Sequence, residues 1–223
     1  MNSRYDWSKY NKKRNIEAIK IDKYNSKKTI HYFEKGIYNH IRDIYALSLM
    51  LAKGKKNTQV LDYGGNLISH CNLLNKINIK RIFFLIYNPY ILNINKKLNF
   101  KYKSSNKISD IINKKFNLIY LGSSLQYIND INNLIKLKII SNSNYVLITH
   151  TPISFKEQKV VKKLRQINHK ELFQNIYSYK FIYQKLLNKK FELIFKSINH
   201  QKYSGINKKY KNIFSVNLLF KKK

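Results

Sequence analysis

From about residue 57 onward, short apolar runs of strand length alternate with longer amphipathic stretches, and this alternation restricts the possible folds. It predicts strands over residues 59–63, 81–87, 100–102, 116–121 and 145–149. Apolar residues at positions 131, 134, 135 and 139 have the one-sided spacing of a helix that crosses a sheet. Strands that alternate with such helices form a parallel sheet, so we expect an α/β, Rossmann-like fold.

The last part of the chain predicts how this sheet is closed. A helix near 181–187 precedes two strand-like runs, 191–199 and 212–221, which we expect to pair in antiparallel fashion. The whole sheet would then be mostly parallel and seven-stranded, with helices on both faces. The long connection at 152–180 is expected to be rich in loops and to serve as a lid or substrate wall.

The region before the first predicted strand has a different pattern of polar and apolar residues. It is polar, and apolar residues between Ile37 and Leu51 recur at spacings of three and four. We therefore expect an N-terminal helical cap over 1–56, followed by a Rossmann-like domain over 57–223. A length of 223 residues fits this single core with a cap.

The net charge of +33 would by itself predict a nucleic-acid or anionic-membrane partner. However, the chain holds 39 Lys, 29 Asn and 32 Ile but only 5 Arg, and the Lys residues are spread over its whole length. Selected phosphate-binding surfaces favour the planar Arg side chain. Drift of the composition in an AT-rich genome therefore explains the charge better, and we do not expect a nucleic-acid partner.

Cysteine and histidine content restricts the chemistry further. The one cysteine, Cys71, excludes an internal disulfide, and no apolar run approaches the roughly 18 residues of a membrane span. We therefore expect a cytoplasmic protein without a transmembrane segment. Five histidines show no spacing typical of metal ligands, and we predict no metal site. They are His31, His40, His70, His169 and His200.

A glycine turn follows the first predicted strand. The strand ends in Asp62 and Tyr63, and Gly64, Gly65 and Asn66 come next. A turn of this composition lets the backbone approach a nucleotide closely. The alternative is a tight β-turn that binds no ligand.

Two more polar clusters follow predicted strands. Residues 122–127 read Gly-Ser-Ser-Leu-Gln-Tyr after the strand at 116–121, and His150, Thr151 and Pro152 follow the strand at 145–149. In an open parallel sheet, ligands bind outside the carboxyl ends of the strands. All three clusters are therefore expected at one edge. The alternative for residues 126–127 is a purely structural role, in which they begin a capped helix and the aromatic ring packs in the core.

Together these motifs resemble a subgroup of bacterial class I S-adenosylmethionine-dependent methyltransferases. Its members combine a V-L-D-F-G-G turn, an S-x-L-Q-Y segment, an R-T-P segment and a later I-Y-x-x-Y stretch. The matches here are VLDYGG at 60–65, SSLQY at 123–127, THTP at 149–152 and IYSY at 176–179. Trp7 and the helical region before the first predicted strand also fit, so the resemblance covers most of the chain. The resemblance implies transfer of a methyl group from S-adenosylmethionine to an oxygen or nitrogen acceptor. It also implies a small-molecule or carbohydrate acceptor, because related proteins look like members of surface-polysaccharide pathways.

The resemblance implies a role for the residues of each motif. Cofactor binding is expected for residues at the ends of three strands: Asp62, Tyr63, Gly64, Gly65, Asn66, Tyr87, Asn88, Ser123 and Ser124. Catalytic roles are expected for Gln126, Tyr127 and His150. The unperturbed pKa of histidine, about 6.5, suits proton acceptance at neutral pH, although a lone histidine is often structural. Substrate contacts are expected for Thr151, Gln166, Tyr177 and Tyr179.

Several positions depart from the family pattern. Asn66 and Ile68 stand where the second and third glycines of the DxGxGxG motif belong, and His150 replaces the arginine of R-T-P. Tyr87 occupies the position of the acid that binds ribose hydroxyls, so Asn88 would be a neutral and weaker acceptor. These departures leave open a catalytically degenerate protein that keeps the fold and serves as a binding or scaffold subunit. An RNA-directed methyltransferase is supported only by the net charge.

Overall fold

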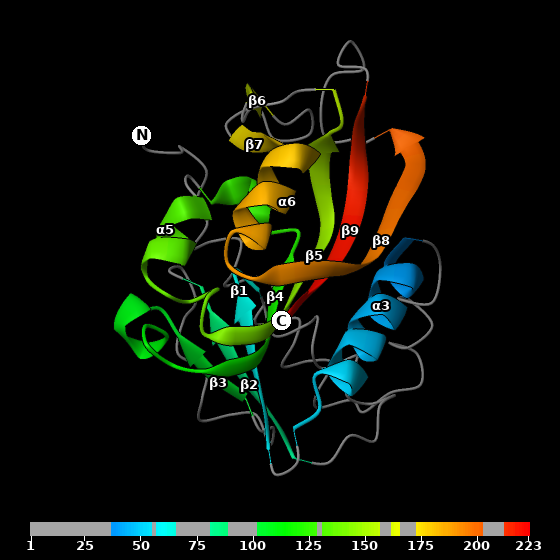
Figure 1. Cartoon of the computed structure of the whole chain (residues 1–223). Helices are drawn as coiled ribbons and strands as arrows, with labels where there is room; N and C mark the ends of the chain where they lie inside the picture. The colour runs from blue at the N-terminus through cyan, green and yellow to red at the C-terminus, as the bar shows by residue number, and fades with distance from the viewer. Residues whose placement is uncertain are drawn as a thin grey trace, which may run out of the picture.

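The computed structural model describes residues 37–54, 57–65, 81–88, 102–128, 131–156, 162–165, 173–202 and 212–223. Within these residues, nine strands form one mixed sheet that carries helices on both faces (Figure 1). The α/β fold class predicted from the sequence is confirmed. No helix in the described ranges is both long enough and apolar enough to cross a membrane.

Five parallel strands form the part of the sheet that was predicted from βα alternation. They lie in the order β3-β2-β1-β4-β5. Their bounds are β1 (Thr58–Tyr63), β2 (Ile82–Tyr87), β3 (Tyr102–Ser105), β4 (Phe116–Gly122) and β5 (Ser143–Ser154). The strands β1, β4 and β5 are adjacent and parallel, as predicted. The third strand was predicted too early, because β3 ends in the buried polar residues Ser104 and Ser105, which no apolar pattern indicates.

The predicted antiparallel closure is confirmed. The strand β9 (Ile213–Lys222) pairs with β5 on one side and with β8 (Phe191–Lys202) on the other, and both pairings are antiparallel. Apolar side chains alternate along β9, and Val216, Leu218 and Phe220 face one core of the protein. Successive side chains of a strand point to opposite faces, so every second residue of β9 faces the same side of the sheet.

The connection at 152–180 was predicted as loop-rich, and this prediction is wrong for the described residues. Two strands lie there, β6 (Lys162–Arg165) and β7 (Phe173–Ser178), which pair in antiparallel fashion. The strand β7 also runs parallel to the end of β5, where β5 extends past β4. The sheet is therefore mixed and larger than the seven-stranded sheet that was predicted. Buried polar residues in β7, Gln174 and Asn175, hide it from an apolar pattern.

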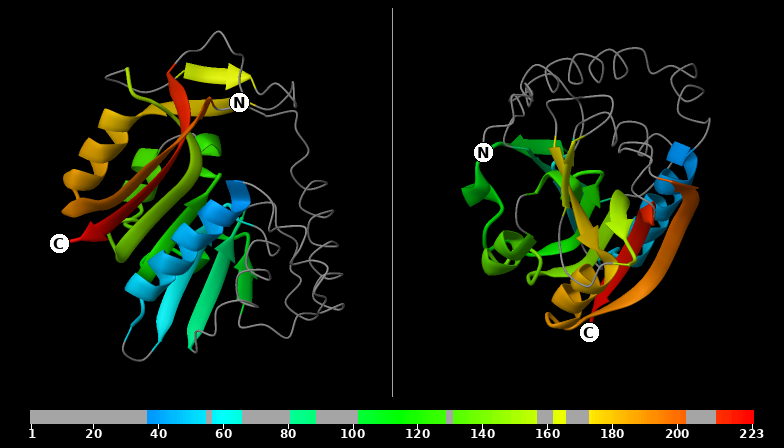
Figure 2. Two further views of the ribbon diagram at one scale, coloured as in Figure 1. Left: turned by 90° about the vertical axis from the view of Figure 1, so that its right-hand side faces the viewer. Right: turned by 90° about the horizontal axis from the view of Figure 1, so that it is seen from above.

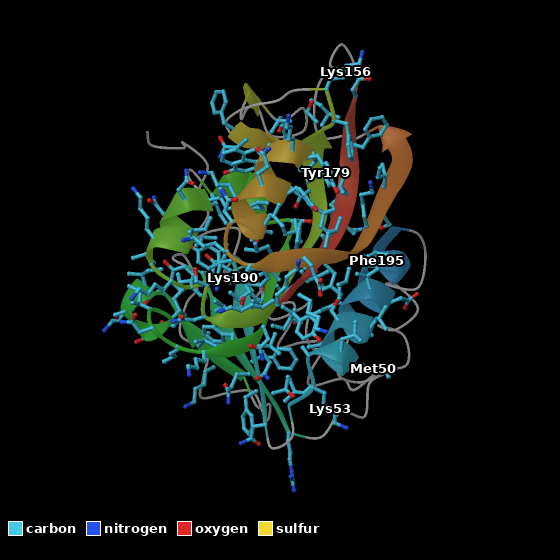
Figure 3. The ribbon with its side chains drawn as sticks, viewed as in Figure 1. Met50, Lys53, Lys156, Tyr179, Lys190 and Phe195 are labelled. Atoms are coloured by element: carbon cyan, nitrogen blue, oxygen red, sulfur yellow. The ribbon has the colours of Figure 1, made fainter. Side chains whose placement is uncertain are left out.

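The two faces of the sheet are covered by different helices (Figure 2). On one face α3 (Ile37–Leu51) packs through residues such as Ile44 and Leu49, and Phe195 of β8 lies beside it (Figure 3). On the other face lie α5 (Ile131–Lys136) and α6 (Tyr179–Leu187). The helix α3 is the only part of the predicted cap 1–56 that the structure describes as helix. The cap as a domain therefore stays a prediction.

Candidate functional site

The carboxyl ends of β1, β4 and β5 meet at one edge of the sheet, because these strands are parallel neighbours. Asp62 lies near the end of β1 with only 1% of its surface exposed, and β4 ends at Gly122. On β5 the same edge carries Thr149 and His150. The structure thus brings together the three polar clusters that the sequence predicted to meet.

The glycine turn after β1 is packed too closely for side chains. Gly64 has φ +82°, and a β-carbon there would lie 2.7 Å from the β-carbon of Ser124. Its amide donates a hydrogen bond to the carbonyl of Tyr87 at 2.7 Å. A β-carbon on Gly65 would overlap the carboxylate of Asp62. Glycine is therefore required at Gly64, and a side chain at Gly65 would displace the Asp62 carboxylate, while Asn66 lies outside the described residues.

The residues after β2 support this turn. The side-chain nitrogen of Asn88 donates to the carbonyl of Gly65 at 3.2 Å, and its backbone amide donates to Ser105 at 3.0 Å. The rings of Tyr63 and Tyr87 lie with centroids 4.9 Å apart. Burial, with a smaller contribution from Tyr87, raises the pKa of Tyr63 to about 12. Burial raises the pKa of Tyr87 as well, so the ends of β1 and β2 present neutral phenols.

The loop after β4 carries two buried acceptors. It turns at Ser123, where φ is +52°, and continues into the short 3-10 helix η2 (Leu125–Tyr127). Gln126 is only 1% exposed. Neither its Oε1 nor the Oγ of Ser124 has a hydrogen-bond partner among the described residues. Buried polar atoms are nearly always paired in native proteins, so these two require an explanation.

The position of this loop is fixed by β7. The carbonyl of Ile128 accepts two hydrogen bonds, one from the side-chain nitrogen of Asn175 at 2.8 Å and one from the hydroxyl of Tyr177 at 2.6 Å. Tyr177 was predicted to contact substrate, and the structure places it in the core with 2% exposure. Its hydroxyl therefore holds the loop. The role of Asn175 was missed, because β7 was not recognised as a strand.

The other predicted substrate contacts lie in different surroundings. Thr151 is buried, and its hydroxyl donates to the carbonyl of Thr149 at 3.2 Å. Tyr179 begins α6 (Figure 3). Its ring is stacked on Phe155 at 5.2 Å, and the ammonium of Lys196 lies 5.1 Å from its centroid. Gln166 lies outside the described residues. A direct contact of these residues with substrate stays a prediction.

His150 lies in an irregular part of β5. The pairing of β5 with β9 shifts register between Ile148 and Thr151, and φ of His150 is +48°. Its amide donates to the side-chain oxygen of Asn217 at 2.9 Å, and its Nδ1 lies 2.9 Å from the hydroxyl of Ser215. Burial lowers the pKa of His150 below its usual value, which favours the neutral ring.

Three contributors to this edge were not found from the sequence. Ser215 and Asn217 are two residues apart in the apolar strand β9 and therefore lie on the same face of the sheet. This spacing of polar residues was the sequence signal that could have identified them. Tyr120 of β4 gave no such signal. It is buried, stacks on Tyr45 of α3 at 4.0 Å and accepts a hydrogen bond from Thr149 at 3.1 Å. Burial and the nearby carboxylate of Asp62 raise its pKa.

The charged groups of the described residues do not gather into a metal centre. Within those ranges, no three His, Cys, Asp or Glu side chains lie together in a way that would hold an ion. The edge instead combines a close-packed glycine turn, buried acceptors and a neutral histidine. Such an edge can bind a polar ligand and accept a proton.

Comparisons with known proteins give similarity at the level of the fold. No protein-family model and no curated protein matches the chain. An O-methyltransferase from a trans-AT PKS multienzyme of Brevibacillus brevis, solved with S-adenosyl-L-homocysteine, has a TM-score of 0.57 at 14% identity, over 81% of this chain and 71% of that one. Magnesium protoporphyrin IX methyltransferase of Synechocystis PCC 6803, with bound S-adenosylhomocysteine, has a TM-score of 0.53 at 10% identity, over 93% and 100%.

The cyclase SpnF is similar to the same degree, with a TM-score of 0.59 at 12% identity, over 83% of this chain and 81% of that one. These similarities show a Rossmann-like fold of the class I methyltransferase type. The expected bacterial subgroup with its VLDYGG and SSLQY motifs is not confirmed by them. Because a cyclase shares the fold, function must be argued from the residues of the site.

Proposed function

We propose that the chain binds S-adenosylmethionine at the carboxyl ends of β1, β2 and β4 and transfers its methyl group to an oxygen or nitrogen acceptor. The bare backbone of the turn, next to two buried acceptors after β4, carries this proposal. A side chain on Gly64 would meet Ser124, and one on Gly65 would displace the Asp62 carboxylate. A backbone stripped of side chains at the end of the first strand is what close approach to a nucleotide requires.

The residues at this edge fit the hydrogen-bonding groups of that cofactor. Its ammonium group, ribose hydroxyls and adenine amino group are all donors, and the edge is rich in acceptors. Ser124 Oγ and Gln126 Oε1 are buried acceptors without a partner among the described residues. The oxygen of the Asn88 side chain lies beside the turn, because the nitrogen of the same amide is bound to Gly65.

Tyr87 makes the expected affinity lower than that of a site with an acid after β2. A hydrogen bond to a carboxylate is roughly twice as strong as one between neutral groups. Burial raises the pKa of Tyr87, so this residue does not supply a negative charge. This observation also favours the second candidate function, a degenerate protein that keeps the fold as a binding or scaffold subunit.

In the proposed reaction the chain orients the reactants and accepts a proton. When bound, the cofactor supplies an electrophilic methyl group. We propose that Gln126 and Tyr127 of η2 line the site of methyl transfer. The two hydrogen bonds to the carbonyl of Ile128 hold these residues in place. We propose that His150 is the base that accepts the proton released by the methyl acceptor, since burial lowers the pKa of His150 and keeps its ring neutral.

We propose a small-molecule or carbohydrate acceptor. The strands β6 and β7 extend the sheet beyond β4 at the carboxyl edge, where the connection 152–180 would serve as the substrate wall. An RNA acceptor has no support beyond the net charge of +33. It would require binding that weakens steeply with added salt.

Calorimetric titration with S-adenosylmethionine and S-adenosylhomocysteine tests the proposal. The wild type and Asp43→Ala, which removes an exposed carboxylate of α3, are expected to bind with similar affinity. Asp62→Ala is expected to lose binding while remaining folded by circular dichroism. Absence of binding by folded wild-type protein would overturn the proposal and leave the scaffold function, to be pursued by a search for a protein partner.

A further inference from the structure

The backbone at His150 is held in an unfavourable conformation by its neighbours. A non-glycine residue with φ of +48° is uncommon and persists only where surrounding contacts fix it. The register shift between Ile148 and Thr151 is a β-bulge, a device that turns a side chain to a new direction near functional sites. The orientation of the His150 side chain thus depends on the pairing with β9 as well as on β5 itself.

Asn217 is the residue that holds this bulge. Its side-chain oxygen accepts from the amide of His150 at 2.9 Å, and its side-chain nitrogen donates to the hydroxyl of Ser197 on β8 at 3.0 Å. Asn217 is buried, so both ends of its amide are used away from water. Because both ends of the amide are hydrogen-bonded, Asn217 ties the bulge of β5 to β8.

Ser215 then fixes the imidazole ring. Its hydroxyl lies 2.9 Å from Nδ1 of His150, and Ser215 is buried opposite Pro152 in the register of β5 and β9. Ser123 adds a longer hydrogen bond to the carbonyl of His150 at 3.5 Å. Ser123, Ser215 and Asn217 are all neutral, so the contacts of the ring and backbone with them add no charge.

We propose that Ser215 is a positioning residue that keeps the proton of the neutral His150 ring on Nδ1, with its Oγ as the acceptor, and so makes Nε2 the nitrogen that exchanges a proton with the methyl acceptor. The catalytic part of this inference rests on the proposed function. The direction of the Ser215 hydrogen bond also rests on that proton transfer, but the tautomer can be measured without a ligand.

The direction of the Ser215 hydrogen bond follows from the two protonation states of the ring. When Nε2 takes the proton that the acceptor releases, the imidazolium carries N–H groups on both nitrogens. A hydroxyl that accepts from Nδ1 fits both states without moving. A hydroxyl that donated to Nδ1 would have to rotate in every cycle, and the neutral ring would then carry its proton on Nε2 and accept none there.

Long-range proton–nitrogen NMR spectra of the full, nitrogen-15-labelled chain at neutral pH test the tautomer. The signals of His150 are identified by their loss in His150→Gln. We expect a protonated Nδ1 in the wild type, a mixture of tautomers in Ser215→Ala, and the wild-type tautomer in Ser215→Thr, which restores the hydroxyl. Ser143→Ala, which removes a buried hydroxyl at the other end of β5, is the matched control and is expected to leave the tautomer unchanged.

An unprotonated Nδ1 in the wild type, or a tautomer that Ser215→Ala leaves unchanged, would overturn the inference. Kinetics then test its catalytic part. Ser215→Ala is expected to lower kcat about tenfold with KM nearly unchanged, and Ser215→Thr to restore it. If the tautomer is as expected but the wild type does not bind S-adenosylmethionine, the proposed function fails and the catalytic part with it. If it binds but the tautomer differs, only the role of Ser215 fails.

Discussion

The backbone of Gly64 lies directly against the side chain of Ser124, so that a β-carbon on Gly64 would come within 2.7 Å of the Ser124 β-carbon. This contact joins the turn after β1 to the loop after β4. It explains why the glycine motif and the SSLQY motif, which are far apart in the sequence, act as one surface. Buried acceptors lie on the loop side of this surface, at Ser124 and Gln126.

Gly64→Ala tests whether the turn must remain in this conformation. Its φ of +82° disfavours any side chain, and the added β-carbon would push the loop after β4 away. We expect a loss of about 1 kcal/mol or more in the free energy of unfolding, measured by urea denaturation. Affinity for S-adenosylhomocysteine should fall as well. Unchanged stability together with unchanged affinity would show that the turn adopts another conformation.

Ser124→Ala and Gln126→Met separate ligand binding from folding. Neither Ser124 Oγ nor Gln126 Oε1 has a hydrogen-bond partner among the described residues, so their removal should leave the free energy of unfolding unchanged or slightly raised. If the cofactor satisfies them, affinity should fall about tenfold, or about 1.4 kcal/mol, in calorimetry.

Ser143→Ala is the control for this pair, since its buried hydroxyl donates to Ile140 at 2.7 Å. It should cost about 1 kcal/mol of stability and leave affinity unchanged. A large loss of stability in Ser124→Ala would contradict the interpretation, because it would reveal a partner that folding provides.

Tyr177→Phe and Asn175→Ala test how β7 holds the loop. Both side chains donate to the carbonyl of Ile128, so either single change leaves one donor in place. Each should cost about 1 kcal/mol in urea denaturation. The double variant leaves a carbonyl without a donor, and its loss should exceed the sum of the two singles. Additive losses would argue that the two hydrogen bonds act independently.

The pH dependence of stability follows from His150. Burial lowers its pKa in the folded state below the ordinary 6.5, so between these two values the unfolded chain binds a proton that the folded chain does not. His150 therefore favours unfolding as pH falls below 6.5, until the folded-state pKa is passed. Melting temperatures recorded from about pH 8 to about pH 5 should fall less steeply in His150→Gln. Identical slopes would assign the pH dependence to other groups.

The strands that the sequence predicted well are those whose apolar residues dominate. The strands β1, β2 and β4 lie within a residue of their predicted bounds, because their side chains fill the sheet core on both faces. The strands β3 and β7 bury hydroxyl and amide groups instead, and apolar patterning misplaced one and missed the other. Their polar side chains find partners outside the strands, since the Ser105 hydroxyl pairs with Asp110 and the Asn175 amide donates to the carbonyl of Ile128.

The sequence alone determined the α/β class, the five parallel strands with their closing antiparallel pair, and the existence of a glycine turn at the end of the first strand. Each of these features depends on local hydrophobicity and backbone freedom, which residues close together in the sequence determine. Only the tertiary structure decided that Tyr177 holds the loop after β4 and that Ser215 and Asn217 hold His150. Those roles depend on hydrogen bonds between residues distant in the chain, and such partners become known only when the strands are paired.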